Sequence, residues 1–484
     1  MAGELLQIYK INEVYNKIIC DPDIAYELRE FFTFTVPGYQ FTPAFKNKMW
    51  DGKYRLYNPL NALLYSGLLS YVEEFARLRE YEIEYMSDFN ANEFSLKEAK
   101  EFIKTLNLTL EPRDYQIDSF THCVRNNRTL LLSPTSSGKS LIIYMLIRYY
   151  NAKTLLIVPN TGLIHQMASD FLSYGYDDPD NIHKIFSGQE KYGNQTLFIS
   201  TWQSLHRLPK DYFDQFDLVI GDEAHGFKAK SLTSIMTKLE DCKYRFGTTG
   251  TLDGTKINKL VLEGLFGSTY QVITTSEMID QKFASDFYIK NIVLNYPDQI
   301  KKLAVKLTYQ QEIDYLYQLN ARNRFILNLA LSLEGNTIIL FRYVEKHGKI
   351  LYDMLKQLAP DKEVYFIAGE VDGKERNNIR NKINNTDNSI TIASEGTTST
   401  GVNIPKLNNI IFASPSKGRI KNLQSIGRLL RLSENKEYAT LYDISDDLSW
   451  KLKKNYTLLH FIERIKIYNE EKFKYKTYKV NLKV

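Results

Sequence analysis

Cysteine is scarce in this chain of 484 residues, which contains only Cys20, Cys123 and Cys242. The three are odd in number and far apart, and no CxxC pair or Cys/His cluster has the spacing of a metal site. This usage is typical of a reducing compartment, where disulfides do not persist. We expect no structural metal, and thiols that are buried as small apolar groups.

Long hydrophobic runs are also missing. No apolar stretch approaches the ~18 residues that a transmembrane helix requires. The first residues, MAGELLQIYKINEVY, lack the apolar centre of a secretory signal. We therefore expect a cytoplasmic protein without a membrane partner.

A strong net charge is the third missing feature, because 62 Lys and Arg stand against 57 Asp and Glu, for a net charge of +5. The charge is unevenly distributed. Residues 451–484 carry 10 basic and 3 acidic side chains, a local charge of +7. Residues 1–108 sum to −4, with 12 basic and 16 acidic side chains. A basic segment of this kind favours a polyanionic partner.

Short apolar runs alternate with longer amphipathic stretches through most of the chain, which favours βαβ units and parallel sheets. The length suggests ~3 domains. We predict a small α+β domain over 1–108, an α/β lobe over 109–285, a second α/β lobe over 286–450 and a basic segment over 451–484. The predicted strands of the lobes are 129–132, 154–159, 196–200, 216–223, 336–341, 363–369, 389–394, 408–414 and 439–444. The basic segment reads as a helix followed by a strand.

Residues 46–58, KNKMWDGKYRLYN, place Asp51-Gly52 between short aromatic runs. That dipeptide is a strong two-residue hairpin signal. In the predicted hairpin Lys53 and Arg55 form a basic face, and Tyr54 and Leu56 pack on the other. The alternative is that the aromatic residues are only the core of the small domain.

Residues 130–141, LLLSPTSSGKSL, run from an apolar strand through small residues into Gly-Lys-Ser. A loop of this kind directs backbone N–H groups at phosphate, although Ser133 stands where such loops usually begin with Gly. Lys139 is predicted to reach the β- and γ-phosphates and the Ser140 hydroxyl to reach Mg²⁺. We expect that any small residue can present its backbone N–H group to phosphate at the positions of this loop where φ is negative. The residues predicted to cradle the phosphates are Thr135, Ser136, Ser137, Gly138, Lys139 and Ser140.

Two carboxylates end the predicted strand at 219–225, VIGDEAH. Buried carboxylates are costly unless they are solvated or bind a cation. Asp222 is predicted to hold Mg²⁺ through water, and Glu223 to orient and deprotonate an attacking water. A chance acidic strand end is the alternative, which the Gly-Lys-Ser loop about 80 residues earlier makes improbable.

A basic helix is predicted at 424–431, QSIGRLLR, where Arg428 and Arg431 share one face. Two fixed guanidinium groups are suited to a γ-phosphate across a cleft, as arginine fingers. The alternative is a solvated basic surface, which accounts for neither Gln424 nor Gly427.

In this order, these motifs resemble those of superfamily 2 helicases and translocases over roughly 109–443. The resemblance implies two RecA-like lobes that bind ATP and Mg²⁺ between them. Further segments match: EPRDYQ (111–116), VPNTGLIHQ (158–166), ISTWQSL (199–205), FGTTGT (246–251) and SEGTTSTGVNIP (394–405). Gly250 and Asn403 depart from the usual Ala and Asp. The roles that the resemblance implies are nucleotide contacts by Arg113, Gln116, Gly401, Asn403 and Gln424, coupling by His225, Thr249 and Thr251, and DNA contacts by Pro159, Gln166, Thr201 and Thr398.

The whole layout, with its small N-terminal domain and compact core, resembles phage recombination helicases. That resemblance implies a DNA helicase for forks, Holliday junctions and R-loops, with DNA or an RNA–DNA hybrid as substrate. It also implies phage replication or recombination proteins as partners, in the host cytoplasm. Lys53 and Arg55 would add DNA contacts. Three alternatives stay open: an RNA helicase, a DNA-binding module with an inactive ATPase fold, and the motor subunit of a restriction complex.

Overall fold

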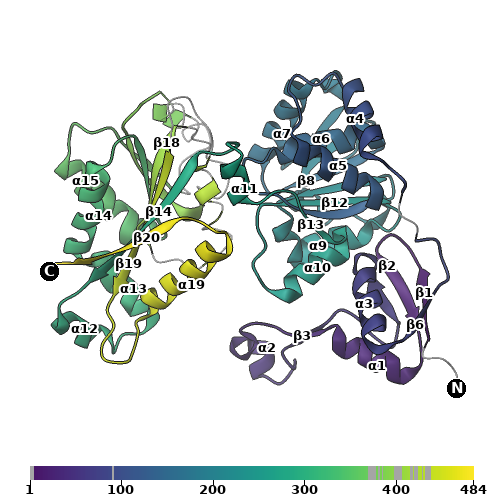
Figure 1. Cartoon of the computed structure of the whole chain (residues 1–484), viewed down its shortest axis with the longest axis horizontal. Coiled ribbons are helices and arrows are strands. Elements are labelled where there is room, and N and C mark those ends of the chain that lie inside the picture. Colours follow the sequence, from purple (N-terminus) through teal and green to yellow (C-terminus); the bar gives the residue numbers. More distant parts are fainter. Residues whose placement is uncertain are drawn as a thin grey trace. The chain divides into compact units, whose positions relative to one another are not determined.

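A computed structural model describes residues 5–89, 92–368, 378–379, 382–383, 385–396, 406–414, 418, 423, 425–427, 429–430 and 438–483. The chain divides into two compact units. One comprises Met1–Ser133 and Gly138–Val272, and the other Ile273–Val484 with the short segment Pro134–Ser137. Each contains its own seven-stranded sheet (Figure 1). The prediction of two tandem α/β lobes is confirmed.

All strand pairs of the first lobe are parallel, in the order β13-β7-β12-β11-β8-β10-β9. The interior strand β8 (Thr154–Val158) is buried at every position, as expected when helices cover both faces of a sheet. Figure 1 shows α5 (Asp114–Asn126), α6 (Lys139–Tyr150) and α7 (Thr161–Tyr174) on one side, with α9 (Lys230–Lys238) and α10 (Lys256–Phe266) on the other. The remaining strands are β7 (Arg128–Leu132), β9 (Ile182–Ile185), β10 (Leu197–Thr201), β11 (Leu218–Asp222), β12 (Tyr244–Thr249) and β13 (Thr269–Gln271).

The second lobe has the strand order β16-β17-β15-β18-β19-β14-β20, again with parallel pairs throughout. Its strands are β14 (Asp286–Asn295), β15 (Asn336–Phe341), β16 (Val364–Ile367), β17 (Ile390–Ser394), β18 (Leu407–Phe412), β19 (Tyr438–Asp447) and β20 (Tyr475–Asn481). Its described helices include α11 (Thr275–Asp280), α12 (Asp298–Ala304), α13 (Tyr309–Gln318), α14 (Asn320–Ser332) and α15 (Lys349–Leu358).

The basic segment after residue 450 folds onto this second sheet. It forms α19 (Tyr456–Glu470) and then β20, which pairs with β14. Arg464 of α19 donates to both carboxylate oxygens of Asp443, at 2.8 and 2.7 Å. The predicted helix and strand are confirmed, and a buried ion pair fixes the helix on the sheet.

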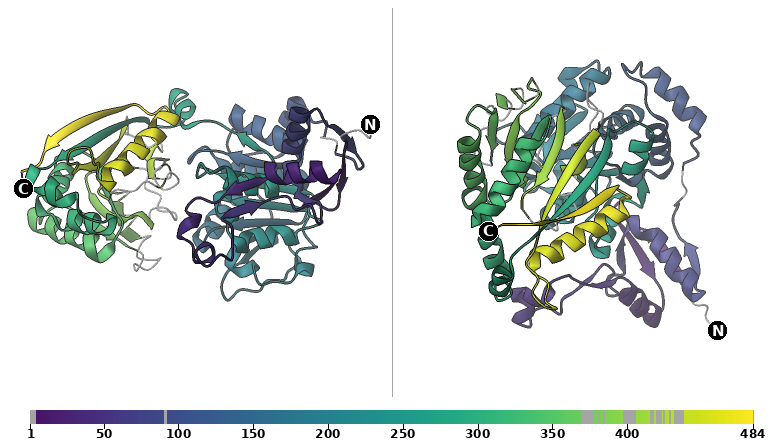
Figure 2. Two further views of the ribbon diagram at one scale, coloured as in Figure 1. Left: turned by 90° about the horizontal axis from the view of Figure 1, so that it is seen from below. Right: turned by 60° about the vertical axis from the view of Figure 1, so that its left-hand side comes forward.

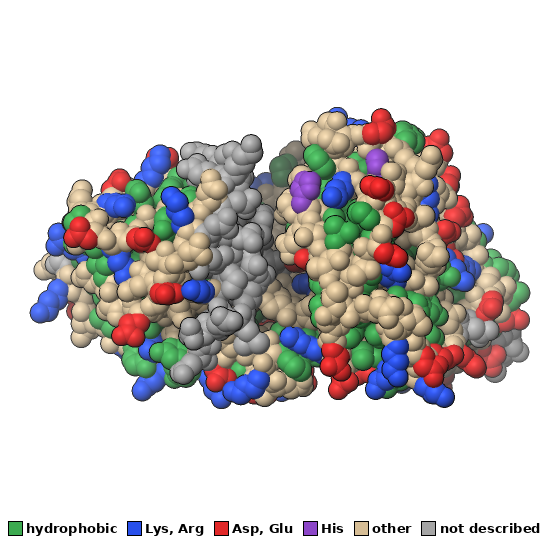
Figure 3. Space-filling model, turned by 90° about the horizontal axis from the view of Figure 1, so that it is seen from above, with side chains coloured by type: hydrophobic (Ala, Val, Ile, Leu, Met, Phe, Trp, Pro, Cys, Tyr) green, Lys and Arg blue, Asp and Glu red, His purple; other side chains and the backbone are tan. Residues whose placement is uncertain are grey.

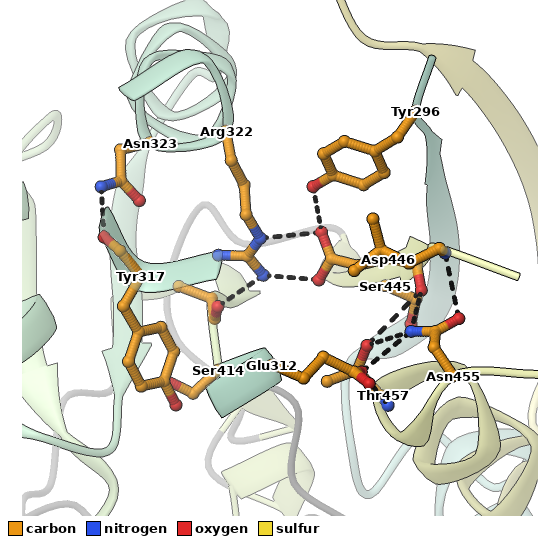
Figure 4. Close-up of polar contacts among 12 residues, drawn as sticks. Tyr296, Glu312, Tyr317, Arg322, Asn323, Ser414, Ser445, Asp446, Asn455 and Thr457 are labelled. Atoms are coloured by element: carbon orange, nitrogen blue, oxygen red, sulfur yellow. Dashed lines mark hydrogen bonds and ion pairs between the residues drawn. The ribbon is translucent and has the colours of Figure 1, made fainter. Parts of the chain in front are cut away.

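A second buried ion pair joins α14 to β19 (Figure 4). Arg322 donates to both oxygens of Asp446, at 2.8 and 2.9 Å, and Tyr296 donates to the same carboxylate at 2.6 Å. Glu312 accepts from the backbone N–H groups of Tyr456 and Thr457, at 3.0 and 2.8 Å. It satisfies N–H groups that have no partner inside the first turn of α19.

The N-terminal region forms a mixed sheet of order β5-β2-β1-β6, in which β1 pairs antiparallel with β2 and parallel with β6. The elements are β1 (Leu5–Lys10), β2 (Tyr15–Ile19), α1 (Pro22–Phe31), β5 (Leu63–Tyr65), α3 (Leu69–Arg79) and β6 (Glu82–Tyr85). The prediction of a small α+β domain is confirmed. Its buried side chains and those of the first lobe belong to one apolar core, so the two form a single body.

The predicted hairpin at 46–58 is wrong. Strand β4 (Lys53–Arg55) pairs with β3 (Thr33–Thr35), and the residues before Asp51 form helix α2 (Pro43–Lys46). Gly52 does adopt the left-handed conformation that the turn signal implies, with φ of +78°. The prediction of a turn at Asp51-Gly52 was therefore correct. The predicted pairing of the strands on either side of it was wrong, because the partner of β4 lies about 20 residues earlier in the chain. Tyr54 is also exposed rather than packed.

Candidate nucleotide and nucleic-acid site

Most of the predicted site residues of the first lobe lie at the carboxyl ends of its parallel strands. The loop after β7 contains Gly-Lys-Ser, β12 ends in Thr249, and β11 ends in Asp222. Pro159 follows β8 and Thr201 ends β10. The order β7-β12-β11-β8-β10 places the phosphate loop, the coupling threonine, the carboxylates and the two DNA candidates in that sequence along one edge. Ligands of open α/β sheets bind at this edge.

Lys139 begins α6 and its ammonium lies back over the loop. Nζ donates to the Ser133 carbonyl at 3.4 Å and lies 3.9 Å from Glu223 Oε1. The Ser140 hydroxyl shares a hydrogen bond with the Tyr174 hydroxyl at 2.7 Å. Both side chains predicted to act on phosphate and Mg²⁺ therefore stand at the start of one helix, whose N-terminal N–H groups favour an anion.

Two residues of the loop have positive φ, so the condition under which any small residue would suffice does not hold at every position. Ser136 has φ of +71° and Gly138 has φ of +78°. Glycine adopts this conformation freely, but a residue with a Cβ does so at a cost of about 1–2 kcal/mol. The Ser136 hydroxyl is buried and has no hydrogen-bond partner among the described residues. A strained residue with an unsatisfied donor is consistent with a loop shaped for a ligand.

Asp222 is a buried carboxylate that accepts from the Thr248 hydroxyl at 2.8 Å. Burial, followed by the neighbouring charge of Glu223, raises its pKa above the ordinary range of an aspartate. A divalent cation would offset both effects, because it favours the ionised form. The chemistry of these groups fits Mg²⁺, with the Ser140 hydroxyl and, through water, Asp222 as oxygen donors of the kind that this ion prefers.

Glu223 begins a short polar chain that leads toward the end of β12. Its backbone is in the left-handed conformation, with φ of +51°, and His225 Nδ1 lies 3.3 Å from its Oε2. Nδ1 also lies 3.1 Å from the Thr249 hydroxyl, which itself donates to the Thr251 carbonyl at 3.0 Å. Since that hydroxyl has only one hydrogen, Nδ1 must carry the proton and donate. Hydrogen bonds therefore link the three predicted coupling residues, and His225 Nδ1 also lies close to the Glu223 carboxylate.

Gln116 lies beside the phosphate loop. Its amide Nε2 donates to the Gly138 carbonyl at 3.2 Å, while Oε1 accepts from the Arg113 N–H at 2.8 Å. A Cβ on Gly138 would lie 2.3 Å from that amide, so a larger residue would displace the end of the Gln116 side chain, and the φ of +78° favours glycine there in any case. Arg113 donates to the Tyr115 hydroxyl at 2.8 Å.

The DNA candidates of the first lobe divide by exposure. Pro159 is half-buried, Gln166 is exposed on α7, and Thr201 is buried with its hydroxyl 3.2 Å from Ser204 Oγ. Over the described residues of the face in Figure 3, basic and acidic side chains are interspersed. Lys53 and Arg55 lie far from these residues in the sequence, on β4, where Arg55 forms an ion pair with Asp51. That ion pair lowers the pKa of Asp51 to about 2.

Six predicted site residues lie outside the described residues: Thr398, Gly401, Asn403, Gln424, Arg428 and Arg431. Sequence reasoning missed two partners that the structure places at the site, Tyr174 against Ser140 and Thr248 against Asp222. Thr248 lies within FGTTGT, so its position beside the DEAH strand could have been inferred. No sequence signal points to Tyr174, because it lies 34 positions after Ser140, at the end of another helix.

Family models match three parts of the chain. The model "DNA helicase UvsW, N-terminal" matches residues 9–86, "Type III restriction enzyme, res subunit" matches 109–254, and "Helicase conserved C-terminal domain" matches 321–433. Each matched range falls within one part of the chain: the small N-terminal domain, the first lobe or the second lobe. Fold and motifs thus define a superfamily 2 ATP-dependent DNA helicase.

One relative is similar over almost the whole length. The ATP-dependent DNA helicase uvsW of Enterobacteria phage T4 is 36% identical over 493 residues, which span 96% of this chain and 97% of that protein. Its crystal structure superimposes with a TM-score of 0.53 at 33% identity, over 99% of this chain and 100% of that one. The chain belongs to the UvsW family of DNA helicases.

More distant structures share the fold alone. The DNA-bound restriction-modification enzyme LlaBIII has a TM-score of 0.59 at 15% identity, over 86% of this chain and 34% of that one. An RNA-bound yeast Dbp5 variant has a TM-score of 0.53 at 11% identity, over 79% of this chain and 93% of that one. No described helix is both long and apolar enough to cross a membrane.

Proposed function

We propose that this DNA helicase remodels branched DNA, namely stalled forks, Holliday junctions and R-loops, in phage recombination, replication and repair. The observation that carries the proposal is the N-terminal UvsW-type domain, which shares one apolar core with the first lobe. Tyr71 donates to Glu263 across this boundary at 2.7 Å. A domain fixed to the motor can present a branch to it at a constant geometry. The host cytoplasm and phage replication or recombination proteins are the proposed setting and partners.

ATP hydrolysis begins, in this proposal, with the γ-phosphate against Lys139 and the loop N–H groups. Mg²⁺, when bound, would be held by the Ser140 hydroxyl and, through water, by Asp222. Glu223 accepts the proton of the attacking water, which is the task of a general base. Gln116 and Arg113 hold the adenine, for which Gln116 exchanges its present hydrogen bonds. The orphaned hydroxyls of Ser136 and Thr251 support a polar ligand here, since both are buried without a partner among the described residues.

The second lobe completes the site when ATP draws the lobes together. Arg428 and Arg431 are the proposed arginine fingers, with Gln424, Gly401 and Asn403 as further nucleotide contacts. Because the fingers bind only in the closed state, ATP shifts the population toward closure and hydrolysis reverses the shift. The chain from Glu223 through His225 to Thr249 and Thr251 reports the state of the phosphate to the DNA side.

DNA lies, in this proposal, along the part of the sheet edge formed by Pro159, Gln166 and Thr201, with Thr398 from the second lobe. These residues hold the backbone and do not read sequence. Lys53 and Arg55 add contacts from the N-terminal domain. The basic segment after residue 450 adds a further contact, since Lys476 lies over the ring of Tyr478 at 5.4 Å on the exposed strand β20. Lysine with exposed aromatic rings suits backbone tracking and base stacking.

The test is ATPase and unwinding on forks, four-way junctions, R-loops and plain duplexes of equal length, with an RNA duplex beside them. Branched DNA should give the highest rates, and EDTA should abolish both activities. Equal rates on plain duplex and on branched DNA would contradict the branched-DNA proposal. Preference for the RNA duplex would point instead to an RNA substrate.

A further inference from the structure

An arm, defined as residues 33–55, projects from the N-terminal domain (Figures 1 and 2). Its base is the two-stranded ladder of β3 and β4, and its tip carries the 3₁₀ turn η1 (Tyr39–Phe41) and α2. Among the described residues, α2 packs chiefly against η1. The tip has its own small aromatic core, in which the rings of Tyr39 and Phe45 meet edge to face at 4.6 Å. A Cβ on Gly52 would lie 2.2 Å from the Tyr39 ring, so only glycine at this position lets that ring pack against the backbone of the arm.

The arm concentrates the positive charge of an otherwise acidic region. It has four basic residues, Lys46, Lys48, Lys53 and Arg55, and one acid, Asp51. Residues 1–108 sum to −4, so the region without the arm sums to −7, against +3 for the arm itself. Arg55 pairs with Asp51, but the three lysines are exposed and form no ion pair with a described residue. An isolated basic element of this kind fits a polyanion.

The same arm exposes two large apolar side chains. Phe41 is 74% exposed and Met49 is 75% exposed, and both belong to the tip of the arm, Phe41 in η1 and Met49 just after α2. Single exposed apolar residues are ordinary. It is less ordinary for two of them to stand on one projecting element together with three lysines that form no ion pair with a described residue. Phe and Met are among the side chains that enter between base steps and unstack them.

The base of the arm is firmly attached to the motor. Leu56 N–H donates to the Phe32 carbonyl at 3.0 Å, and the Thr33 hydroxyl donates to the Arg29 carbonyl at 2.6 Å. The domain behind it shares its core with the lobe that contains Lys139 and Glu223. Any step that this lobe takes along DNA therefore moves the arm with it.

We propose that the arm is a strand-separating wedge. The lysines hold the phosphates of the duplex, and Phe41 and Met49 enter the base stack where the strands part at a branch. The ligand of the arm is thus the exposed base step at the branch point of a DNA junction. The inference rests on the proposed function, because a wedge acts only if the motor draws branched DNA past it.

The test is the double substitution Phe41→Ala with Met49→Ala. Leu60→Ala is the matched control, because Leu60 is an apolar residue of the same domain that lies outside the arm and is 95% exposed. Three quantities are measured for both: ATPase stimulated by single-stranded DNA, unwinding of a fork, and fluorescence of 2-aminopurine at the branch point. The double variant should keep its ATPase within about twofold and lose unwinding by about tenfold or more. Wild type should increase the 2-aminopurine fluorescence on binding without ATP, and the double variant should not.

The outcomes separate the two proposals. If wild type unwinds forks and the double variant unwinds as fast as Leu60→Ala, the wedge is refuted and the branched-DNA function stands. If wild type shows no preference for branched DNA, the proposed function itself fails. Thermal unfolding of each variant checks that the fold is intact, which removal of two exposed side chains should leave unchanged. An increase in 2-aminopurine fluorescence with the double variant as large as that with the wild type would likewise overturn the wedge.

Discussion

Glu223→Gln should separate ATP binding from ATP turnover. The substitution keeps the shape of the side chain and its reach toward His225 Nδ1, 3.3 Å away in the wild type. It removes the carboxylate that accepts a proton from water. A general base contributes about 10²–10⁴-fold to the rate, which corresponds to about 2.7–5.5 kcal/mol of activation free energy. Turnover in the presence of DNA should fall by that factor.

The structure also predicts the direction of the change in affinity. The charge of Glu223 is one of the two main reasons that the pKa of Asp222 is raised. With that charge removed, Asp222 ionises more readily and should bind Mg²⁺ with nucleotide at least as tightly as in the wild type. The assay is single-turnover ATP hydrolysis with DNA, beside affinity for a fluorescent ATP analogue. Normal turnover, or a large loss of affinity in a folded variant, would refute this role of Glu223.

Three further substitutions test other parts of the site. Lys139→Ala should weaken binding of a fluorescent ATP analogue directly, whereas Arg431→Ala should leave affinity without DNA nearly intact and lower DNA-stimulated turnover by about 10³-fold; equal losses of affinity would exclude an arginine finger. Lys53→Ala combined with Arg55→Ala should weaken DNA binding and reduce the salt slope by about 1–2, as filter binding at several salt concentrations would show; an unchanged slope would leave β4 as scaffold. Ser136→Gly should raise the free energy of unfolding by up to about 1 kcal/mol, and with it the midpoint of thermal unfolding slightly, because it relieves the positive φ; a lower midpoint would mean that the hydroxyl itself stabilises the loop.

Patterns within a few residues of one another predicted most of the core. The runs TLLIV and NTIILF form buried interior strands because β-branched and apolar residues in short runs suit a sheet that is covered on both faces. The positions of the residues of the candidate ATP half-site could be predicted in the same way. Its residues come directly after strands, and parallel strands bring their carboxyl ends to one edge.

Features that depend on distant pairing were not predicted. The turn at Asp51-Gly52 was recognised, but β4 pairs with Thr33–Thr35, and no local signal identifies that partner. Ser136 adopts positive φ although serine rarely does, because the surrounding loop determines its conformation. The buried ion pair of Arg322 with Asp446 spans 124 positions, so only the folded chain reveals it.

Regression of a model replication fork tests the central claim most directly. The measurement follows conversion of a stalled fork, labelled on both arms, into a four-way junction in the presence of ATP and Mg²⁺. The wild-type protein should drive the conversion, and Glu223→Gln at the same concentration should bind the fork without converting it. Regression by Glu223→Gln at the wild-type rate, or failure of the wild type on a fork that it binds, would contradict an ATP-driven motor for branched DNA.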